Sequence, residues 1–110
     1  DVVEELLVFA RKKIKWLQQI GLPKERIIFD VGIGFGKTAE QSLELLERIT
    51  EFNCLGVPLF VGHSRKSFMK LLTDAPAHER DELTLKFSKQ LAAKGVEYLR
   101  VHNVELHDGI

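Results

Sequence analysis

Charged and hydroxyl side chains gather at three places in this sequence, each directly after a short apolar run. Asp30 ends the first run and leads into the glycine-rich stretch 31–37, and the cluster Ser64-Arg65-Lys66-Ser67 follows the second run. Arg100 and His102 end the third run. Arginine and lysine hold phosphates and carboxylates through charge-assisted hydrogen bonds. If the three runs are parallel strands, their C-terminal ends share one edge, which predicts a site there for an anionic substrate or leaving group.

Helical and strand patterns alternate between these clusters. Apolar residues spaced by three and four predict a helix over 2–20, and a capping-box pattern at Thr38 and Gln41 predicts a second helix that buries Leu45, Leu46, Ile49 and Phe52. A third helix is predicted over 80–94, a helical turn over 68–72, strands over 26–30, 58–62 and 97–101, and loops over 31–37, 63–67 and 73–79. This alternation predicts an α/β fold made of parallel βαβ units. Because a parallel sheet needs both of its faces covered, we expect these three strands to be part of a larger sheet.

Bulk composition narrows the class of protein. The 110 residues carry 16 basic and 16 acidic side chains, so we expect no general attraction to nucleic acid or to a membrane surface. The 45% hydrophobic fraction is typical of a soluble globular protein, and no apolar run is long enough to span a membrane. The single cysteine, Cys54, excludes an internal disulfide and favours a reducing cytoplasm. Because Asp1 already stands inside a helical pattern, we expect a piece of a longer protein.

The glycine-rich stretch misses both common nucleotide-binding patterns by one residue. A Walker A loop needs glycine at position 31, where this chain has Val31, and a dinucleotide fingerprint needs glycine where Lys37 stands. Neither nucleotide interpretation is therefore favoured. The glycines certainly shape a tight turn, and that role is compatible with binding a ligand.

Several of these residues also have a purely structural interpretation. Asp30 could cap a turn, but an acid that directly follows three apolar strand residues is expected to be buried and paired, which favours a functional role. Phe35 is equally compatible with anchoring its loop and with facing a ligand. Arg65 and Lys66 could form a solvated pair, although the strand-end position favours a site. Arg100 is unusual at the end of a buried strand, which also favours a site.

The four histidines differ in how well the sequence supports a functional role for them. His63 and His78 lack partners in the sequence, so we expect them to be structural or exposed. His102 stands two positions after Arg100 and is the better functional candidate. His102 and His107 together would supply only two metal ligands, so no metal site is predicted within these residues.

Three segments together resemble the dihydropteroate synthase family. They are Asp30-Val-Gly-Ile-Gly-Phe-Gly-Lys37, Gly62-His-Ser-Arg-Lys-Ser-Phe68 and Leu99-Arg-Val-His-Asn-Val104, in the order and at the spacing of the last three strand-end motifs of that family. The resemblance implies a TIM barrel, a fold of about 250 residues, of which residues 1–110 would be a partial pterin-binding domain holding strands six to eight. It also implies a cytoplasmic transferase of folate biosynthesis, a sulfonamide target, and a homodimeric parent protein.

The implied reaction joins 6-hydroxymethyl-7,8-dihydropterin pyrophosphate to p-aminobenzoate and releases pyrophosphate. The resemblance assigns the pterin to Asp30, Gly62 and Lys66, with Gly32 in the same substrate-binding loop, and the p-aminobenzoate side to Phe35 and Ser67, with Arg65 nearby. It assigns the pyrophosphate to Arg100 and His102, which with Lys66 form the expected catalytic set. Magnesium is the implied cofactor, and its asparagine ligand is expected after the first barrel strand, outside these residues.

Three departures from the family pattern accompany this resemblance. Val31 stands where proline is usual, which changes only the rigidity of the loop. Asn103 stands where the family usually has aspartate, and this change removes a charge beside the expected anion site. The third departure is the segment Arg80–Lys86, which replaces a helix start that is commonly rich in small residues.

Other functions remain open at this point. A non-catalytic protein that binds a pterin or an anion on the same scaffold is the principal alternative, and Asn103 weakly favours it. A P-loop nucleotide binder is disfavoured by Val31. A pterin-binding methyltransferase domain would share the barrel, but it would not be expected to keep both the Ser-Arg-Lys-Ser and the Arg-Val-His motifs.

Overall fold

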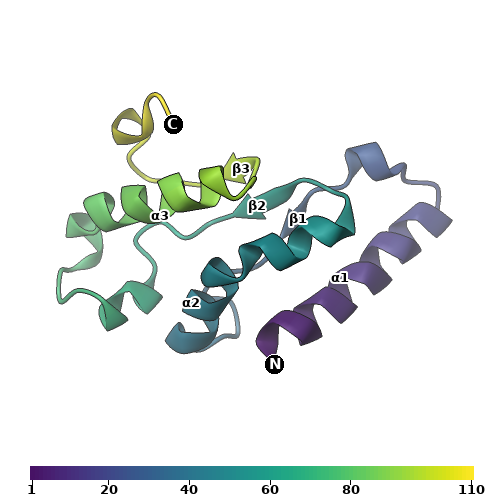
Figure 1. The fold of residues 1–110 in the computed structure, drawn as a ribbon, viewed down its shortest axis with the longest axis horizontal. Coiled ribbons are helices and arrows are strands. Elements are labelled where there is room, and N and C mark those ends of the chain that lie inside the picture. The colour runs from purple at the N-terminus through teal and green to yellow at the C-terminus, as the bar shows by residue number, and fades with distance from the viewer.

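A computed structural model describes all residues from Asp1 to Ile110 and shows one small sheet flanked by three α-helices (Figure 1). The strands are β1 (Phe29–Asp30), β2 (Leu59–Val61) and β3 (Tyr98–Leu99), with β2 at the centre. Both pairings are parallel, as the sequence predicts, with Phe29 opposite Leu59 and Phe60 opposite Tyr98. The α/β class with parallel strands and the alternation of helix and strand are therefore confirmed.

The strands are shorter than the apolar runs that predict them. Residues Lys24–Arg26 form a 3-10 turn, so the predicted strand over 26–30 pairs only from Phe29 onward. At the start of β1, the N–H of Phe29 donates to the carbonyl of Pro58 at 2.9 Å. Just after β3, the N–H of Arg100 donates to the carbonyl of Val61 at 3.0 Å. Extended backbone thus reaches slightly beyond the paired residues, and polar side chains follow at once.

The helices are α1 (Val2–Gln19), α2 (Ala39–Glu47) and α3 (Asp81–Ala93). Asp1 caps α1 through its carboxylate, and Thr38 and Gln41 form the predicted capping box at the start of α2. Arg80 precedes α3, and its side chain makes no capping hydrogen bond. The helices themselves start and end close to the predicted positions, except at the end of α2.

The second predicted helix is shorter than the sequence suggests. It ends at Glu47, and the chain continues as a 3-10 helix over Ile49–Leu55, which keeps Ile49 and Phe52 buried. Further 3-10 turns occupy Lys24–Arg26, Ser67–Leu71, Ala77–Glu79 and Glu105–His107, so the segment over 73–79 is not wholly a loop. The apolar spacing predicted which side chains are buried but not the tighter winding of the backbone.

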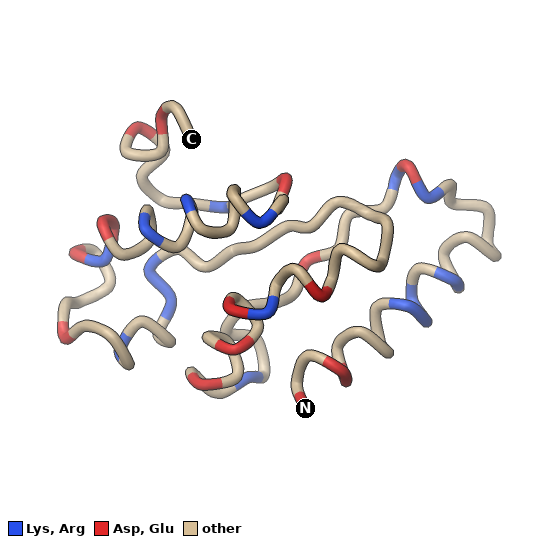
Figure 2. Tube along the Cα trace, in the orientation of Figure 1, with Lys and Arg blue, Asp and Glu red and all other residues tan.

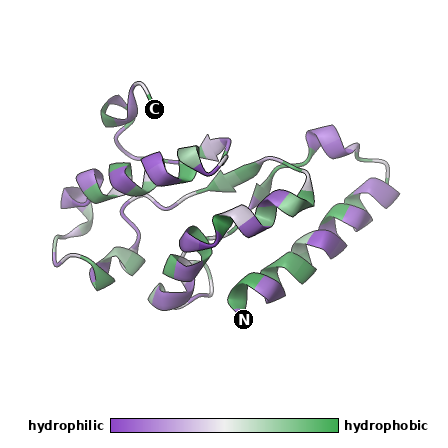
Figure 3. Ribbon diagram, viewed as in Figure 1, coloured by the Kyte–Doolittle hydropathy of each residue, from purple (hydrophilic) through white to green (hydrophobic).

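The two faces of the sheet have different environments. Phe29, Leu59 and Val61 point to the helices and are buried in one continuous core. Figure 3 shows β2 in green, the colour of hydrophobic residues. Asp30 and Phe60 alternate with them and lie on the opposite face, where Asp30 is exposed. Within residues 1–110, helices cover one face of the sheet, and the other face carries polar groups.

Charges of both signs are spread along the elements rather than gathered on one of them (Figure 2). Arg48 at the end of α2 bonds the carboxylate of Asp1 at 2.9 Å and that of Glu51, which ties the start of α1 to the end of α2. None of the helices combines the length and the apolar character that a membrane span requires.

Candidate functional site

A pocket of about 190 Å³ opens on the uncovered face, at the C-terminal ends of the strands. It mixes apolar and charged walls, and its lining consists of Asp30, Ile33, Phe35, Phe60, Gly62, Ser64, Lys66, Arg100 and His102. The three polar clusters singled out in the sequence therefore meet at one edge of the sheet. Ligands of α/β folds bind at this edge.

Not every residue assigned to the site by the sequence lines this pocket. Asp30, Phe35, Gly62, Lys66, Arg100 and His102 do so. Gly32, Arg65 and Ser67 lie outside its wall, so the two arginines and two hydroxyls do not all converge as expected. The cations that face the pocket are Lys66 and Arg100, with the imidazole of His102 beside them.

Asp30 presents its carboxylate to the pocket rather than to the core. One carboxylate oxygen accepts the backbone N–H of Gly32 at 2.8 Å, which fixes the side chain against its own loop. The expectation of a buried, paired acid is wrong, since Asp30 is exposed in residues 1–110. Because Asp30 is the last residue of β1 and lines the pocket, the carboxylate is available to accept N–H groups of a ligand.

Lys66 lies across the glycine loop. Its ammonium donates to the carbonyl of Ile33 at 3.1 Å and stands 4.4 Å from the centre of the Phe35 ring. Gly34 has φ +83°, and a Cβ there would lie 3.5 Å from the Lys66 side chain. Glycine is therefore favoured by its left-handed backbone, and the loop after β1 and the loop after β2 touch through Lys66.

The lysine of the glycine loop is used inside the loop itself. Lys37 donates to the carbonyls of Gly32 and Phe35 at 2.9 and 3.0 Å, and Ser42 of α2 accepts the N–H of Gly34 at 3.1 Å. A P-loop lysine instead reaches out to phosphates. This geometry agrees with the one-residue mismatch in the sequence and counts against the nucleotide-binding alternative.

Ser64 holds the imidazole of His102. The Ser64 hydroxyl oxygen accepts the backbone N–H of His102 at 3.1 Å and lies 2.7 Å from the ring Nδ1. In the tautomer in which the Ser64 hydroxyl donates to Nδ1, the proton of the neutral imidazole is on Nε2, from which it can be donated to a ligand oxygen.

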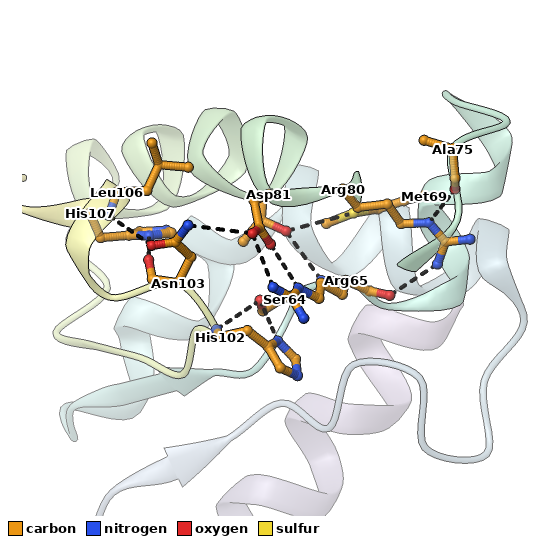
Figure 4. A network of polar contacts seen from close by, with 11 residues as sticks. Ser64, Arg65, Met69, Ala75, Arg80, Asp81, His102, Asn103, Leu106 and His107 are labelled. Carbon is orange, nitrogen blue, oxygen red and sulfur yellow. Dashed lines mark hydrogen bonds and ion pairs between the residues drawn. The ribbon is translucent and has the colours of Figure 1, made fainter. Parts of the chain in front are cut away.

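Arg65 does not line the pocket. Its side chain reaches the start of α3, where Figure 4 shows it bonded to Asp81. Its guanidinium donates to both carboxylate oxygens of Asp81 at 2.7 and 3.0 Å, and its backbone has φ +57°. The hydrogen bonds from Arg65 hold the pKa of Asp81 below its usual range, and Asp81 raises the pKa of Arg65. Arg65 therefore shapes the loop after β2 instead of lining the ligand space.

A series of hydrogen-bonded polar side chains links His63 to His107. His63 is fully buried, and its Nε2 lies 2.8 Å from the Ser88 hydroxyl, which in turn lies 2.7 Å from Nε2 of His107. The Nδ1–H of His107 donates to the carbonyl of Asn103 at 2.8 Å. Burial lowers the pKa of His63 to about 4, so this ring is neutral at physiological pH. His63 is structural, as the sequence suggests, and His107 anchors the chain that follows His102.

Sequence reasoning did not single out four residues that the structure joins to the site. Phe60 and Ile33 line the pocket, and strict alternation along β2 could have assigned Phe60 to the face opposite Leu59. Arg80 and Asp81 contact the loop after β2 from a distant part of the chain. For those two, no local sequence signal indicates the contact.

The family model for pterin binding enzymes matches residues 1–102. Among similar sequences, the folate synthesis bifunctional protein of Chlamydia caviae is 43% identical over 107 residues, which are 97% of this chain and 24% of that protein. The dihydropteroate synthase of Haemophilus influenzae is 35% identical over 104 residues, covering 94% of this chain and 38% of that protein.

Solved structures agree with these sequence matches. The dihydropteroate synthase of Anaplasma phagocytophilum with bound 6-hydroxymethylpterin-monophosphate superimposes with a TM-score of 0.92 at 39% identity, over 96% of this chain and 41% of that one. The enzyme of Xanthomonas albilineans in complex with 7,8-dihydropteroate gives a TM-score of 0.92 at 31% identity, over 97% of this chain and 41% of that one.

The chain thus spans about a quarter to two fifths of the length of these relatives. The match nevertheless runs almost from end to end of residues 1–110 and includes all three strand-end clusters. The alternation of helices and parallel strands, the pocket at their C-terminal ends and the match of residues 1–102 lead to one conclusion: this chain belongs to the pterin binding enzyme family.

Proposed function

We propose that the protein containing these residues is a dihydropteroate synthase, which condenses 6-hydroxymethyl-7,8-dihydropterin pyrophosphate with p-aminobenzoate. The pocket carries this proposal, because it combines a carboxylate, two cations and an imidazole with the apolar side chains of Ile33, Phe35 and Phe60. A flat heterocycle with an anionic tail matches such a lining. Relatives of this chain were solved with a pterin monophosphate and with dihydropteroate, which supports the same substrate class.

Each polar group of the pocket has a distinct task in the proposed reaction. Asp30 accepts N–H groups of the pterin ring, and Lys66 donates to the carbonyl and nitrogen acceptors of the ring from the other loop. Arg100 and His102 bind the pyrophosphate oxygens, with the His102 Nε2–H as a donor. Phe35, which is 71% exposed in residues 1–110, supplies a face for the p-aminobenzoate ring.

The bond between the pterin methylene carbon and the pyrophosphate oxygen breaks, and its electron pair leaves with the pyrophosphate. The amine of p-aminobenzoate donates its lone pair to the methylene carbon and then loses a proton, which gives dihydropteroate. Negative charge grows on the leaving oxygen as the bond breaks, so Arg100 and His102 bind the transition state more strongly than the ground state. Lys66 orients the pterin for this step.

Magnesium, which the resemblance implies, supplies charge neutralisation to the pyrophosphate when it is bound. Residues 1–110 contain no group of three His, Cys, Asp or Glu side chains placed to hold a metal ion. The side chains present therefore do not form a magnesium site by themselves. The asparagine ligand that the resemblance implies is expected outside these residues, and none of the roles proposed for residues of this chain depends on the ion.

We also propose that β1, β2 and β3 are the sixth, seventh and eighth strands of a (β/α)₈ barrel, and that the complete protein is a cytoplasmic homodimer. The one-sided helix cover supports the barrel, since the bare face with Asp30 and Phe60 would line its interior. Localisation and the dimer rest on the resemblance alone.

The test of the function is product formation by the complete protein that contains residues 1–110. Purified protein with magnesium, pterin pyrophosphate and p-aminobenzoate is expected to form dihydropteroate, and Lys66→Ala is expected to lower kcat/KM at least tenfold. Exposed Lys89 of α3 offers a matched control, Lys89→Ala, with unchanged kinetics. Binding of the pterin without any product would instead favour the non-catalytic binding protein. An unchanged Lys66→Ala variant would contradict the role of Lys66.

A further inference from the structure

We propose that Asp81, the first residue of α3, is a positioning residue that ties the loop after β2 to the segment after β3 and so fixes Lys66 relative to His102. The proposal rests on the proposed function, for which these two side chains hold the pterin and the pyrophosphate. Figure 4 shows the Asp81 carboxylate between Arg65 and Asn103. Neither the spacing of the motifs nor their resemblance to a family indicates this residue.

The first half of the tie is the pair formed with Arg65. Both carboxylate oxygens of Asp81 accept from the guanidinium, at 2.7 and 3.0 Å, and both side chains are largely covered, with 21% and 28% of their surface exposed. A bidentate pair of this kind restricts orientation more strongly than a single contact. Since Arg65 directly precedes Lys66, holding Arg65 sets where the Lys66 side chain leaves the loop.

Neighbouring groups of α3 hold the backbone of the same loop. The buried guanidinium of Arg80 donates to the carbonyls of Ala75 and Arg65 at 2.9 and 3.0 Å, and the Thr84 hydroxyl accepts the N–H of Arg65 at 3.1 Å. These contacts support the left-handed conformation of Arg65 (φ +57°), which is costly for a residue with a side chain. The start of α3 therefore determines the shape of the loop.

The second half of the tie is Asn103. Its amide nitrogen donates to the Asp81 carboxylate at 3.4 Å, while its side-chain oxygen accepts the N–H of Leu106 at 3.0 Å. Asn103 directly follows His102, whose ring is held by Ser64 of the other loop. The same carboxylate thus bonds the neighbours of both Lys66 and His102, and it meets a neutral amide at position 103 rather than a second negative charge.

This pairing explains how the chain accommodates Asn103, which departs from the usual aspartate of the family. In this chain the carboxylate that pairs with Arg65 is that of Asp81. An aspartate at 103 beside Asp81 would place two negative charges within hydrogen-bonding distance, and like charges at that distance repel strongly. Positions 81 and 103 should therefore tolerate one acid and one amide but not two acids.

The experiment compares four variants in the complete protein: Asp81→Asn, Asn103→Asp, the double variant carrying both changes, and the control Glu82→Gln. Glu82 is exposed in the same first helical turn, so its variant removes a charge near the helix start without touching either loop. For each variant, the affinity for inorganic pyrophosphate is measured by calorimetry, kcat and KM by product formation, and the melting temperature by calorimetry.

Each single variant is expected to weaken pyrophosphate binding and to lower kcat/KM on the order of tenfold, whereas Glu82→Gln matches the wild type. The double variant is expected to lose no more than Asp81→Asn alone, because it avoids the repulsion of two acids at positions 81 and 103. Additive losses in the double variant, or an Asp81→Asn variant identical to Glu82→Gln, would overturn the proposal. If the wild type forms no dihydropteroate, the proposed function fails, and the order of pyrophosphate affinities still decides the role of Asp81.

Discussion

Ser64 influences the anion site through its hydroxyl group, which bonds both the backbone N–H and the ring Nδ1 of His102. Removing it in Ser64→Ala leaves the imidazole free to rotate and to exchange its tautomers. We expect pyrophosphate affinity to fall about tenfold, which corresponds to the loss of one to two ordinary hydrogen bonds. Calorimetric titration measures the affinity, and ¹⁵N chemical shifts of His102 report the tautomer. A variant with unchanged affinity and an unchanged Nε2–H signal would contradict this role.

His63 makes stability depend on pH. Its pKa is about 4 in the folded protein, because burial disfavours the charged ring and His107 stands nearby, against an ordinary value of 6.5. Between these values the unfolded state binds more protons, so the free energy of unfolding rises with pH and is lost on acidification from 6.5 toward 4. The expected loss is about 3 kcal/mol.

Chemical denaturation of the wild type and of His63→Gln at several pH values checks this expectation. The variant is expected to be less stable at pH 7, because it disturbs the bond to Ser88, and to show a flatter dependence between pH 6.5 and 4. Equal slopes for the two proteins would show that other groups cause the acid sensitivity.

At the scale of single residues, the sequence predicted those pocket residues whose place depends only on their position after a strand. Lys66 and His102 stand in the loops that follow β2 and β3, so their place at the sheet edge follows from the topology. Arg65 stands in the same cluster but pairs with Asp81, which is 16 positions away on another element. The direction of that side chain depends on the placement of α3, which no pattern within the loop encodes.

The start of α2 supports the glycine loop, and its capping box is open to a direct test. The Thr38 hydroxyl oxygen accepts the N–H of Gln41 at 3.1 Å, and the side-chain oxygen of Gln41 accepts the N–H of Thr38 at 3.0 Å. Thr38→Ala removes the first of these bonds and is expected to lower the free energy of unfolding by about 1 kcal/mol. Thermal denaturation measures the change, and Thr38→Ser, which keeps the hydroxyl, is the matched control. Equal stability of the Ala and Ser variants would count against the cap.

The elements were predictable to different degrees. The bounds of α1 and α3 agree closely with the predicted ranges, because a long apolar periodicity defines both helices. The end of α2 was missed, since Ile49 and Phe52 continue the helical spacing while the backbone tightens into a 3-10 helix. The paired strands have only two or three residues, and their ends are set by neighbouring strands rather than by their own apolar runs.

The whole molecule is organised around a sheet that is covered on one side only. Its helix-facing side belongs to a continuous apolar core, and its other side carries the pocket. The outer edges of β1 and β3 have no partner strand within residues 1–110, since β2 pairs with both of them and they pair with nothing else. A parallel strand with a bare edge and a bare face is suited to continuing into further strands.

This geometry leads to a prediction for residues 1–110 produced alone. We expect no detectable dihydropteroate, because the pocket lacks the walls that further strands would supply and because the magnesium ligand is expected outside these residues. The measurement follows product formation from labelled p-aminobenzoate, with the complete protein as the positive control. A circular dichroism spectrum establishes that residues 1–110 are folded, so that inactivity reflects the missing walls. Turnover by the folded residues alone would contradict the need for additional strands and would assign the complete catalytic apparatus to the pocket between Asp30 and His102.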